Sequence, residues 1–129
     1  MRVLLFGTFD HLHPGHRYVL ERGLERGETW VVVARDTNVL RIKGHTPAQA
    51  EEERRRIIEE TYPTIHAVLG DPEDFLAPVR TIKPDLILLG YDQKLPPGVE
   101  EKDLLCPATR LPAFEPGRYK SSLKWKKED

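Results

Sequence analysis

Apolar runs of strand length recur along this chain and alternate with segments of helical character. The runs cover residues 3–6, 30–34, 65–69, 86–89 and, more weakly, 108–111. Strands that are apolar at nearly every position are typical of a parallel sheet covered on both faces. We therefore predict one α/β domain over residues 1–129, a Rossmann-like fold with a five-stranded parallel sheet and helices on both faces. In such a fold ligands bind beyond the carboxyl ends of the strands, at the point where the strand order reverses.

The segments between these runs predict helices with recognisable ends. The first is expected over 16–26 and stops at Gly27. The second is expected to start at the capping box of residues 46–49, with Pro47 at its first position, and to run to about Thr61. A third is expected near 73–82 and a short one after Pro97-Gly98.

Composition excludes several classes of partner and compartment. Lys and Arg number 20 and Asp and Glu number 21 in 129 residues, so we expect no basic field for nucleic acid. The residues after Met1 form a strand pattern rather than a signal segment, and no apolar run reaches bilayer length. A single cysteine, Cys106, permits no internal disulfide and fits a reducing compartment. We expect a soluble, cytoplasmic protein with no membrane partner.

The densest cluster of functional residue types is the run from Gly7 to His16, directly after the first strand. Pro14 suits the first position of a helix, which makes His13 the N-cap and puts His16 in the first turn. Free backbone N–H groups and the positive end of the helix dipole gather there, which favours a phosphate chain. Two alternatives are surface histidines at a helix start and a zinc site. The zinc site lacks further ligands at suitable spacing, so we expect no metal held by the chain alone.

Gly-x-Phe-Asp followed by His-x-Gly-His resembles the signature of the nucleotidylyltransferase superfamily, which transfers AMP or CMP from a nucleoside triphosphate. Further segments are similar to the archaeal-type FAD synthases: Val33-Ala34-Arg35-Asp36, Lys43-Gly44, Arg54-Arg55 and Leu89-Gly90-Tyr91-Asp92-Gln93. The resemblance implies transfer of AMP from ATP to FMN, giving FAD and pyrophosphate. The cytidylyltransferases that act on glycerol 3-phosphate share the first motif and are the alternative. A non-catalytic nucleotide-binding sensor is the alternative of another class.

The same resemblance assigns roles to residues. It implies that His13, His16 and Lys43 are catalytic and that Arg54 binds the acceptor's phosphate. Nucleotide-binding positions would be Gly7, Thr8, Phe9, Asp10, Gly15, Gly90, Asp92, Ser121 and Ser122, the two serines opening a helix that grips the β and γ phosphates. It also implies Mg²⁺ with the nucleotide, and a possible homodimer.

Each role has a structural alternative. Lys43 is expected in a loop, residues 41–44, where it is either a phosphate ligand or a solvated lysine. Arg54 borders the inner face of its helix, or else pairs with Glu51 on the surface. Asp10 and Asp92 either orient substrate or cap turns.

Overall fold

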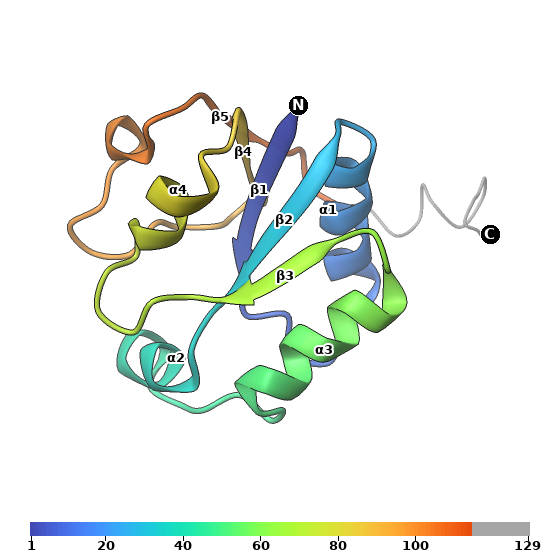
Figure 1. Ribbon diagram of the computed structural model, residues 1–129. Helices are drawn as coiled ribbons and strands as arrows, with labels where there is room; N and C mark the ends of the chain where they lie inside the picture. The colour runs from blue at the N-terminus through green and yellow to red at the C-terminus, as the bar shows by residue number, and fades with distance from the viewer. Residues whose placement is uncertain (115–129) are drawn as a thin grey trace.

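The computed structural model describes residues 1–114, which contain a five-stranded sheet. The strands are β1 (Arg2–Gly7), β2 (Glu28–Val33), β3 (His66–Leu69), β4 (Leu86–Leu89) and β5 (Ala108–Arg110). Every neighbouring pair is parallel, in the order β3-β2-β1-β4-β5 (Figure 1). This confirms the predicted Rossmann-like α/β fold.

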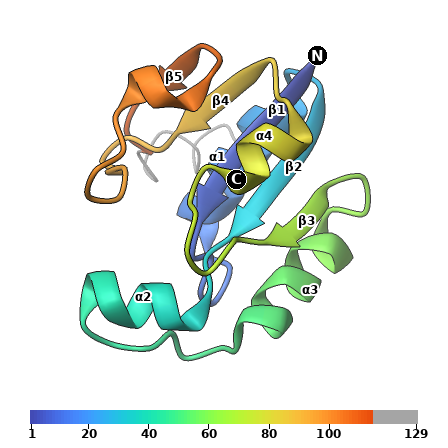
Figure 2. The same ribbon diagram turned by 60° about the vertical axis from the view of Figure 1, so that its left-hand side comes forward.

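Helices cover the two faces of the sheet unequally. They are α1 (Pro14–Leu24), α2 (Asp36–Lys43), α3 (Glu51–Thr61) and α4 (Ala77–Ile82), followed by a 3₁₀ turn, η1 (Glu101–Leu104). Leu20 of α1 and Ile58 of α3 pack on one face, and Val79 and Ile82 of α4 pack on the other. Figures 1 and 2 show α2 apart from these layers, beside the ends of the strand arrows.

The connections place a crevice beside β1. After β1 the chain passes through α1 to β2 on one side, and β4 lies on the other side of β1. The loops that follow β1 and β4 therefore leave the sheet toward opposite faces, which opens the site typical of this topology between their carboxyl ends.

The segment after β2 is helical, which corrects the expectation of a loop at 41–44. Helix α2 spans Asp36–Lys43 and ends at Gly44 with φ 84°. Only Val39 of this helix is buried, while Leu40 and Ile42 are about half exposed. A helix with one buried apolar position gives a weak periodic signal, although the acidic start and the terminal glycine are ordinary helix boundaries.

The predicted capping box at 46–49 is wrong, since α3 begins only at Glu51. The backbone N–H groups of Ala48 and Gln49 instead donate to the carboxylate of Asp10, at 2.8 and 2.9 Å. A tertiary hydrogen bond therefore wins over the local cap, and 46–50 forms a connection that lies against the first motif.

One other helix start moves for a related reason, whereas the first helix begins at the proline that its motif predicts. Asp71 Oδ1 accepts the N–H groups of Glu73 and Asp74, so that segment is a turn and α4 starts at Ala77 rather than near 73. The helix predicted over 16–26 runs from Pro14 to Leu24, with Pro14 in its expected first position.

Among residues 1–114, no helix is both long and apolar enough to cross a bilayer.

Candidate active site

The N-terminus of α1 has the arrangement expected from the histidine motif. His13 is the N-cap, and its Nδ1 accepts from the backbone N–H groups of Gly15 and His16, at 3.1 and 3.3 Å. The backbone N–H of His13 in turn donates to His16 Nδ1 at 3.4 Å. The two rings stack with centroids 3.6 Å apart and an interplanar angle of 18°.

These hydrogen bonds fix the tautomer of both rings. An Nδ1 that accepts a hydrogen bond carries no proton, so a neutral imidazole must hold its proton on Nε2. His13 and His16 therefore each present an Nε2–H donor, beside the positive end of the α1 dipole. Two parallel donors of this kind suit an anion whose charge is spread over several oxygens.

The neutral state of His16 is favoured by its surroundings. Burial lowers the pKa of His16 to about 4, the nearby His13 and Lys43 act in the same direction, and Asp10 opposes them. At neutral pH the ring is then a hydrogen-bond donor without a net charge. The positive charges that line the cleft come from other side chains, among them Lys43.

We expect this lowered pKa to make stability depend on pH. The unfolded chain binds a proton at His16 near pH 6.5 and the folded chain only near pH 4. Protonation thus favours the unfolded state across this window, so the free energy of unfolding should fall between pH 6.5 and 4 and be insensitive to His16 above it. Urea titrations of wild type and His16→Asn test this, because the variant should lose part of that slope. An NMR titration of His16 near pH 6.5 would contradict the assignment.

Two glycines of the motif allow close approaches that a side chain would prevent. A Cβ at Gly7 would lie 2.6 Å from the ring of Phe9, and a Cβ at Gly15 would lie 3.0 Å from the ring of His13. Phe9 is buried with φ 54°, an uncommon backbone conformation for a large residue. Its ring meets His16 edge-on, with centroids 5.3 Å apart. The loop after β1 is therefore shaped to hold the His16 ring.

Lys43 reaches the same loop from the last turn of α2. Its Nζ lies 3.2 Å from Thr8 Oγ1, which follows β1 directly. The side chain is exposed, and it lines the same cleft as Thr8 and His16. Helix α2 thus brings the ammonium group of Lys43 to the histidine cluster, although the sequence predicted Lys43 in a loop.

Asp10 links the loop after β1 to the segment before α3. Desolvation acts to raise the pKa of Asp10, but the backbone donors Ala48 and Gln49, with His11 and Arg54 nearby, lower it overall. Both carboxylate oxygens are occupied by those amides. Asp10 does not line the cleft, so its place is that of a tether between the first motif and the connection to α3.

Arg54 is fully buried, which rules out one of its two alternatives, a surface arginine paired with Glu51. Its guanidinium donates to the carbonyl oxygens of Gln49, Thr8 and Ala34, at 2.7 to 3.0 Å, and to Asp36 Oδ1 at 2.6 Å. All three of its nitrogens are engaged, and Arg54 does not line the cleft. The acceptor phosphate expected at this side chain has no direct access to it in this arrangement.

A reciprocal clasp surrounds Arg54. Glu51 Oε1 accepts the backbone N–H of Asp36 at 2.8 Å, and Asp36 Oδ2 accepts the backbone N–H of Glu51 at 3.2 Å. Each carboxylate thereby caps the first turn of the other residue's helix. Together with Arg54, the clasp fixes α2, and hence Lys43, relative to the end of β1.

The loop after β4 forms the opposite wall. Gly90 and Asp92 line the cleft, and Gln93 Oε1 accepts from the Gly90 N–H at 2.9 Å while its Nε2 donates to Phe6 O at 3.0 Å. Arg110, at the end of β5, donates through Nη1 to the carbonyl oxygens of Gly90, Tyr91 and Gln93, at 2.7 to 3.3 Å. Nothing in the local pattern around Arg110 signals this contact, because it depends on the pairing of β5 with β4.

On the nucleotide-binding role that the family resemblance implies for Gly90 and Asp92, we expect Arg110→Ala to raise the KM for the nucleoside triphosphate about tenfold with a smaller change in kcat. The loop would lose three carbonyl contacts to a charged donor, each of modest value at an exposed position. Steady-state kinetics with the nucleotide varied would measure the split between KM and kcat. Lys102→Ala, an exposed neighbour on η1, is the matched control. An unchanged nucleotide KM in Arg110→Ala would contradict this positioning role.

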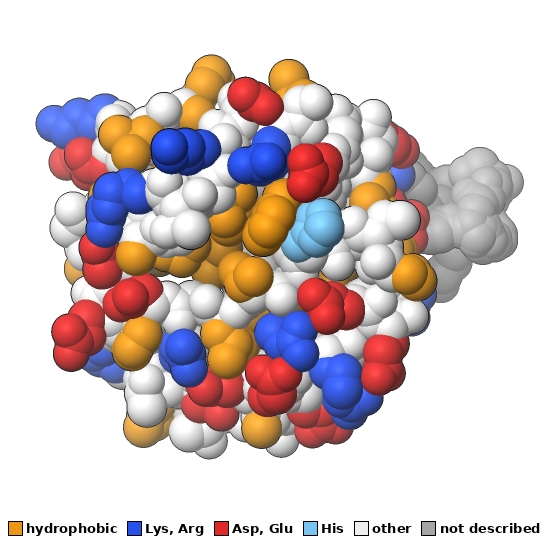
Figure 3. Space-filling model, viewed as in Figure 1, with side chains coloured by type: hydrophobic (Ala, Val, Ile, Leu, Met, Phe, Trp, Pro, Cys, Tyr) orange, Lys and Arg blue, Asp and Glu red, His pale blue; other side chains and the backbone are white. Residues whose placement is uncertain are grey.

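These walls enclose a cleft of about 1090 Å³. Of the residues predicted from the motifs, seven line it, and His13 and Gly15 lie beside it at the start of α1: Gly7, Thr8, Phe9, His16, Lys43, Gly90 and Asp92. Figure 3 shows a hollow with hydrophobic side chains at its floor, between α4 and α2. Ser121 and Ser122 lie outside the described residues. Within residues 1–114 no group of three or more His, Cys, Asp or Glu side chains is placed to hold a metal ion.

Comparison with known proteins identifies the family. The cytidylyltransferase-like family model matches residues 4–109. This chain belongs to the cytidylyltransferase-like family. The FAD synthase of Methanospirillum hungatei is 47% identical to it over 105 residues, which cover 81% of this chain and 66% of that protein. The FAD synthase of Methanoculleus marisnigri is 41% identical, over 96% of this chain and 85% of that protein.

A solved structure agrees with this assignment of a cytidylyltransferase-like fold. The lipopolysaccharide core biosynthesis protein from Thermoplasma volcanium has a TM-score of 0.78 and 34% identity, and the match covers 89% of this chain and 98% of that one. The matched family segment contains the histidine motif, Lys43 and the loop after β4. The family expected from the sequence is therefore confirmed, and with it a nucleotidyltransferase type of enzyme.

Proposed function

We propose that this chain transfers AMP from ATP to FMN, forming FAD and releasing pyrophosphate. The FAD synthases among its relatives support this reaction. The structural observation that carries the proposal is the cleft itself, whose lining combines His16, Thr8 and Lys43 with apolar side chains that pack on the core beside α4. A phosphorylated acceptor with a large apolar group fits such a cleft better than glycerol 3-phosphate does.

In the proposed reaction a phosphate oxygen of FMN attacks the α-phosphorus of ATP. A new P–O bond forms, the bond between the α-phosphorus and the bridging oxygen breaks, and pyrophosphate leaves with that electron pair. A phosphate monoester is largely ionised near neutral pH, so no residue has to remove a proton from the nucleophile. The chain's task is then to align the two phosphates and stabilise the charge on their oxygens.

The residues of the site fit these tasks. The Nε2–H groups of His13 and His16 are set to donate to phosphoryl oxygens, and the start of α1 adds its dipole. Lys43 supplies the positive charge and lies close enough to His16 to influence its pKa. We assign Lys43 to the phosphate oxygens of FMN and of the ATP α-phosphate where the two substrates meet, since Lys43 approaches from the α2 side of the cleft.

A divalent cation is expected to enter with the nucleotide. Both oxygens of Asp10 already accept backbone hydrogen bonds, whereas Asp92, in the loop after β4, is a carboxylate that lines the cleft. These residues fit a metal carried by the triphosphate, and we propose ATP bound as its Mg²⁺ complex. When bound, the ion neutralises charge on the leaving pyrophosphate.

The test is a product assay by chromatography. Purified protein with Mg²⁺ is given ATP or CTP, each with FMN or glycerol 3-phosphate. We expect FAD from the pair ATP and FMN, and no product from the other substrate pairs. A CDP-linked product from glycerol 3-phosphate would overturn the proposed substrates, and nucleotide binding without any product would favour the non-catalytic sensor.

A further inference from the structure

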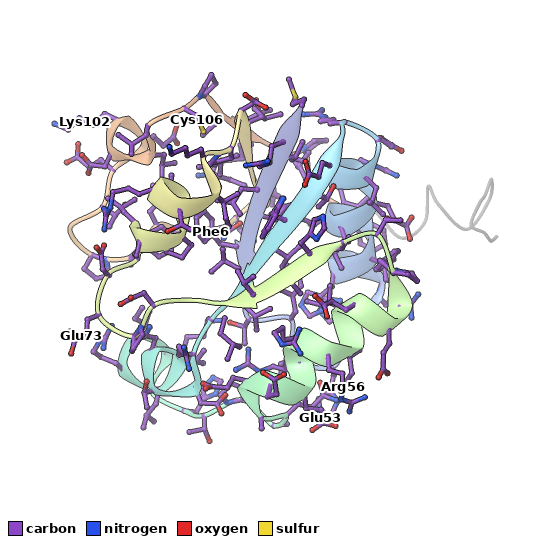
Figure 4. All side chains as sticks on the ribbon, viewed as in Figure 1. Phe6, Glu53, Arg56, Glu73, Lys102 and Cys106 are labelled. Atoms are coloured by element: carbon purple, nitrogen blue, oxygen red, sulfur yellow. The ribbon has the colours of Figure 1, made fainter. Side chains whose placement is uncertain are left out.

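The apolar end of the cleft is built from separate segments of the chain. We call it the apolar chamber and define it by residues from the ends of β1 and β2, the approach to α4, and the segment after β4: Phe6, Val32, Phe75, Leu76, Leu95 and Val99. All six belong to, or pack on, the core cluster between the sheet and α4. Figure 4 shows Phe6 between β1 and α4. The chamber therefore has a firm floor, continuous with the hydrophobic core.

Two aromatic rings form one side of the chamber. Phe6 and Phe75 stack with centroids 4.5 Å apart and an interplanar angle of 27°. Phe6 is 6% exposed and is held by β1, whereas Phe75 is only partly buried. Flat aromatic ligands pack well in offset stacks on such a ring. The pair can thus extend into a stack of three when a planar ligand occupies the chamber.

A polar group elsewhere in the lining of the cleft also suits a heteroaromatic ligand. Asn38, on α2, lines the same cleft, and its Nδ2 donates to Asp71 O at 3.3 Å. Its Oδ1 is buried and has no hydrogen-bond partner among residues 1–114. Buried polar atoms are normally paired, and a ring that carries an N–H group would supply the missing donor.

We propose that the apolar chamber binds the isoalloxazine ring of FMN, with Phe75 as the aromatic wall that selects a flat ring. This inference rests on the proposed function and adds where the acceptor binds and what distinguishes it from small phosphates. The FMN phosphate then lies toward Lys43 and Thr8, which line the same cleft at its polar end. A three-carbon acceptor would leave the half-buried apolar wall in contact with water.

The test measures ring binding apart from catalysis. Riboflavin, which has the ring but no phosphate, is titrated against the protein by quenching of flavin fluorescence. Phe75→Ala should raise the riboflavin Kd about tenfold, the order expected for a lost aromatic stack, and Phe75→Leu should give a smaller rise because apolar contact remains. Leu105→Ala is the control, since Leu105 is 70% exposed and lies outside the cleft. Thermal unfolding of each variant shows whether the fold is retained.

Kinetics separate this inference from the proposed function. In the wild type, Phe75→Ala and Phe75→Leu series, the KM for FMN should follow the riboflavin Kd while the KM for ATP stays constant. If FAD forms but folded Phe75 variants bind riboflavin like the wild type, the chamber assignment is overturned and the reaction stands. If the wild type binds riboflavin through Phe75 but makes no FAD, the chamber stands and the reaction fails. A wild type that does not quench riboflavin overturns the chamber assignment directly.

Discussion

Replacement of His16 by alanine is expected to reduce kcat by about 100-fold while the protein remains folded. The reason is the loss of one preorganised donor to charge that develops on phosphoryl oxygens, which is typically worth that factor or more. His16 is held for this task by the edge of Phe9, by the stacked His13 ring and by the N–H of His13. Initial rates of FAD formation at saturating ATP and FMN measure the loss.

Variants of His13 separate catalysis from helix capping. Asparagine is a good N-cap whose side-chain oxygen can accept the N–H groups that His13 Nδ1 now accepts, but it brings no Nε2–H donor to the phosphates. His13→Asn should therefore keep near-normal stability and lose turnover, whereas His13→Ala should lose turnover and about 1 kcal/mol of stability. His66→Ala, at the opposite end of the sheet on β3, is the control with unchanged turnover. Normal turnover in His13→Asn would leave the motif with a structural role alone.

The features that the sequence predicted well are those set by local chemistry. Continuous apolar runs identified all five strands, because buried parallel strands must be apolar on both faces. The histidine motif predicted the cap and the first turn of α1, because Pro14 and Gly15 restrict the local backbone. Seven motif residues consequently converge on one cleft, as strand ends in this topology must.

The features that it missed depend on contacts between distant segments. Helix α2 is short and has one buried residue, and it is held by Glu51 and Arg54 rather than by a strong pattern of its own. The capping box at 46–49 competes with Asp10, about 38 residues earlier in the chain, and loses. Arg110 and Phe75 join the site only through strand pairing and core packing, so neither stands out in the sequence.

Arg54 is the residue whose removal should cost most stability. Arg54→Ala would leave Asp36 without its cation and would strand the carbonyl oxygens of Thr8, Ala34 and Gln49. Removal of one partner from a buried, hydrogen-bonded ion pair typically costs about 3–5 kcal/mol, and because the Asp36 side chain is 34% exposed we take the lower part of that range. We expect a loss of that size in urea unfolding, and little change in Arg56→Ala, whose ion pair with Glu60 is exposed (Figure 4).

The stability and kinetics of Arg54→Lys distinguish this structural role from the phosphate-binding role that the family resemblance implies. If Arg54 acts as the tether of α2, Arg54→Lys should be destabilised as well, because an ammonium cannot reach four acceptors spread around a planar guanidinium. The KM for FMN should then rise only in step with the fraction of protein that is unfolded or has α2 displaced. A stable Arg54→Lys variant with a selectively raised FMN KM would instead show that the guanidinium leaves its clasp and binds the acceptor phosphate during turnover. The two hypotheses therefore differ in which property of Arg54→Lys changes. The structural role lowers the unfolding midpoint, and the phosphate-binding role raises the KM for FMN in a stable protein.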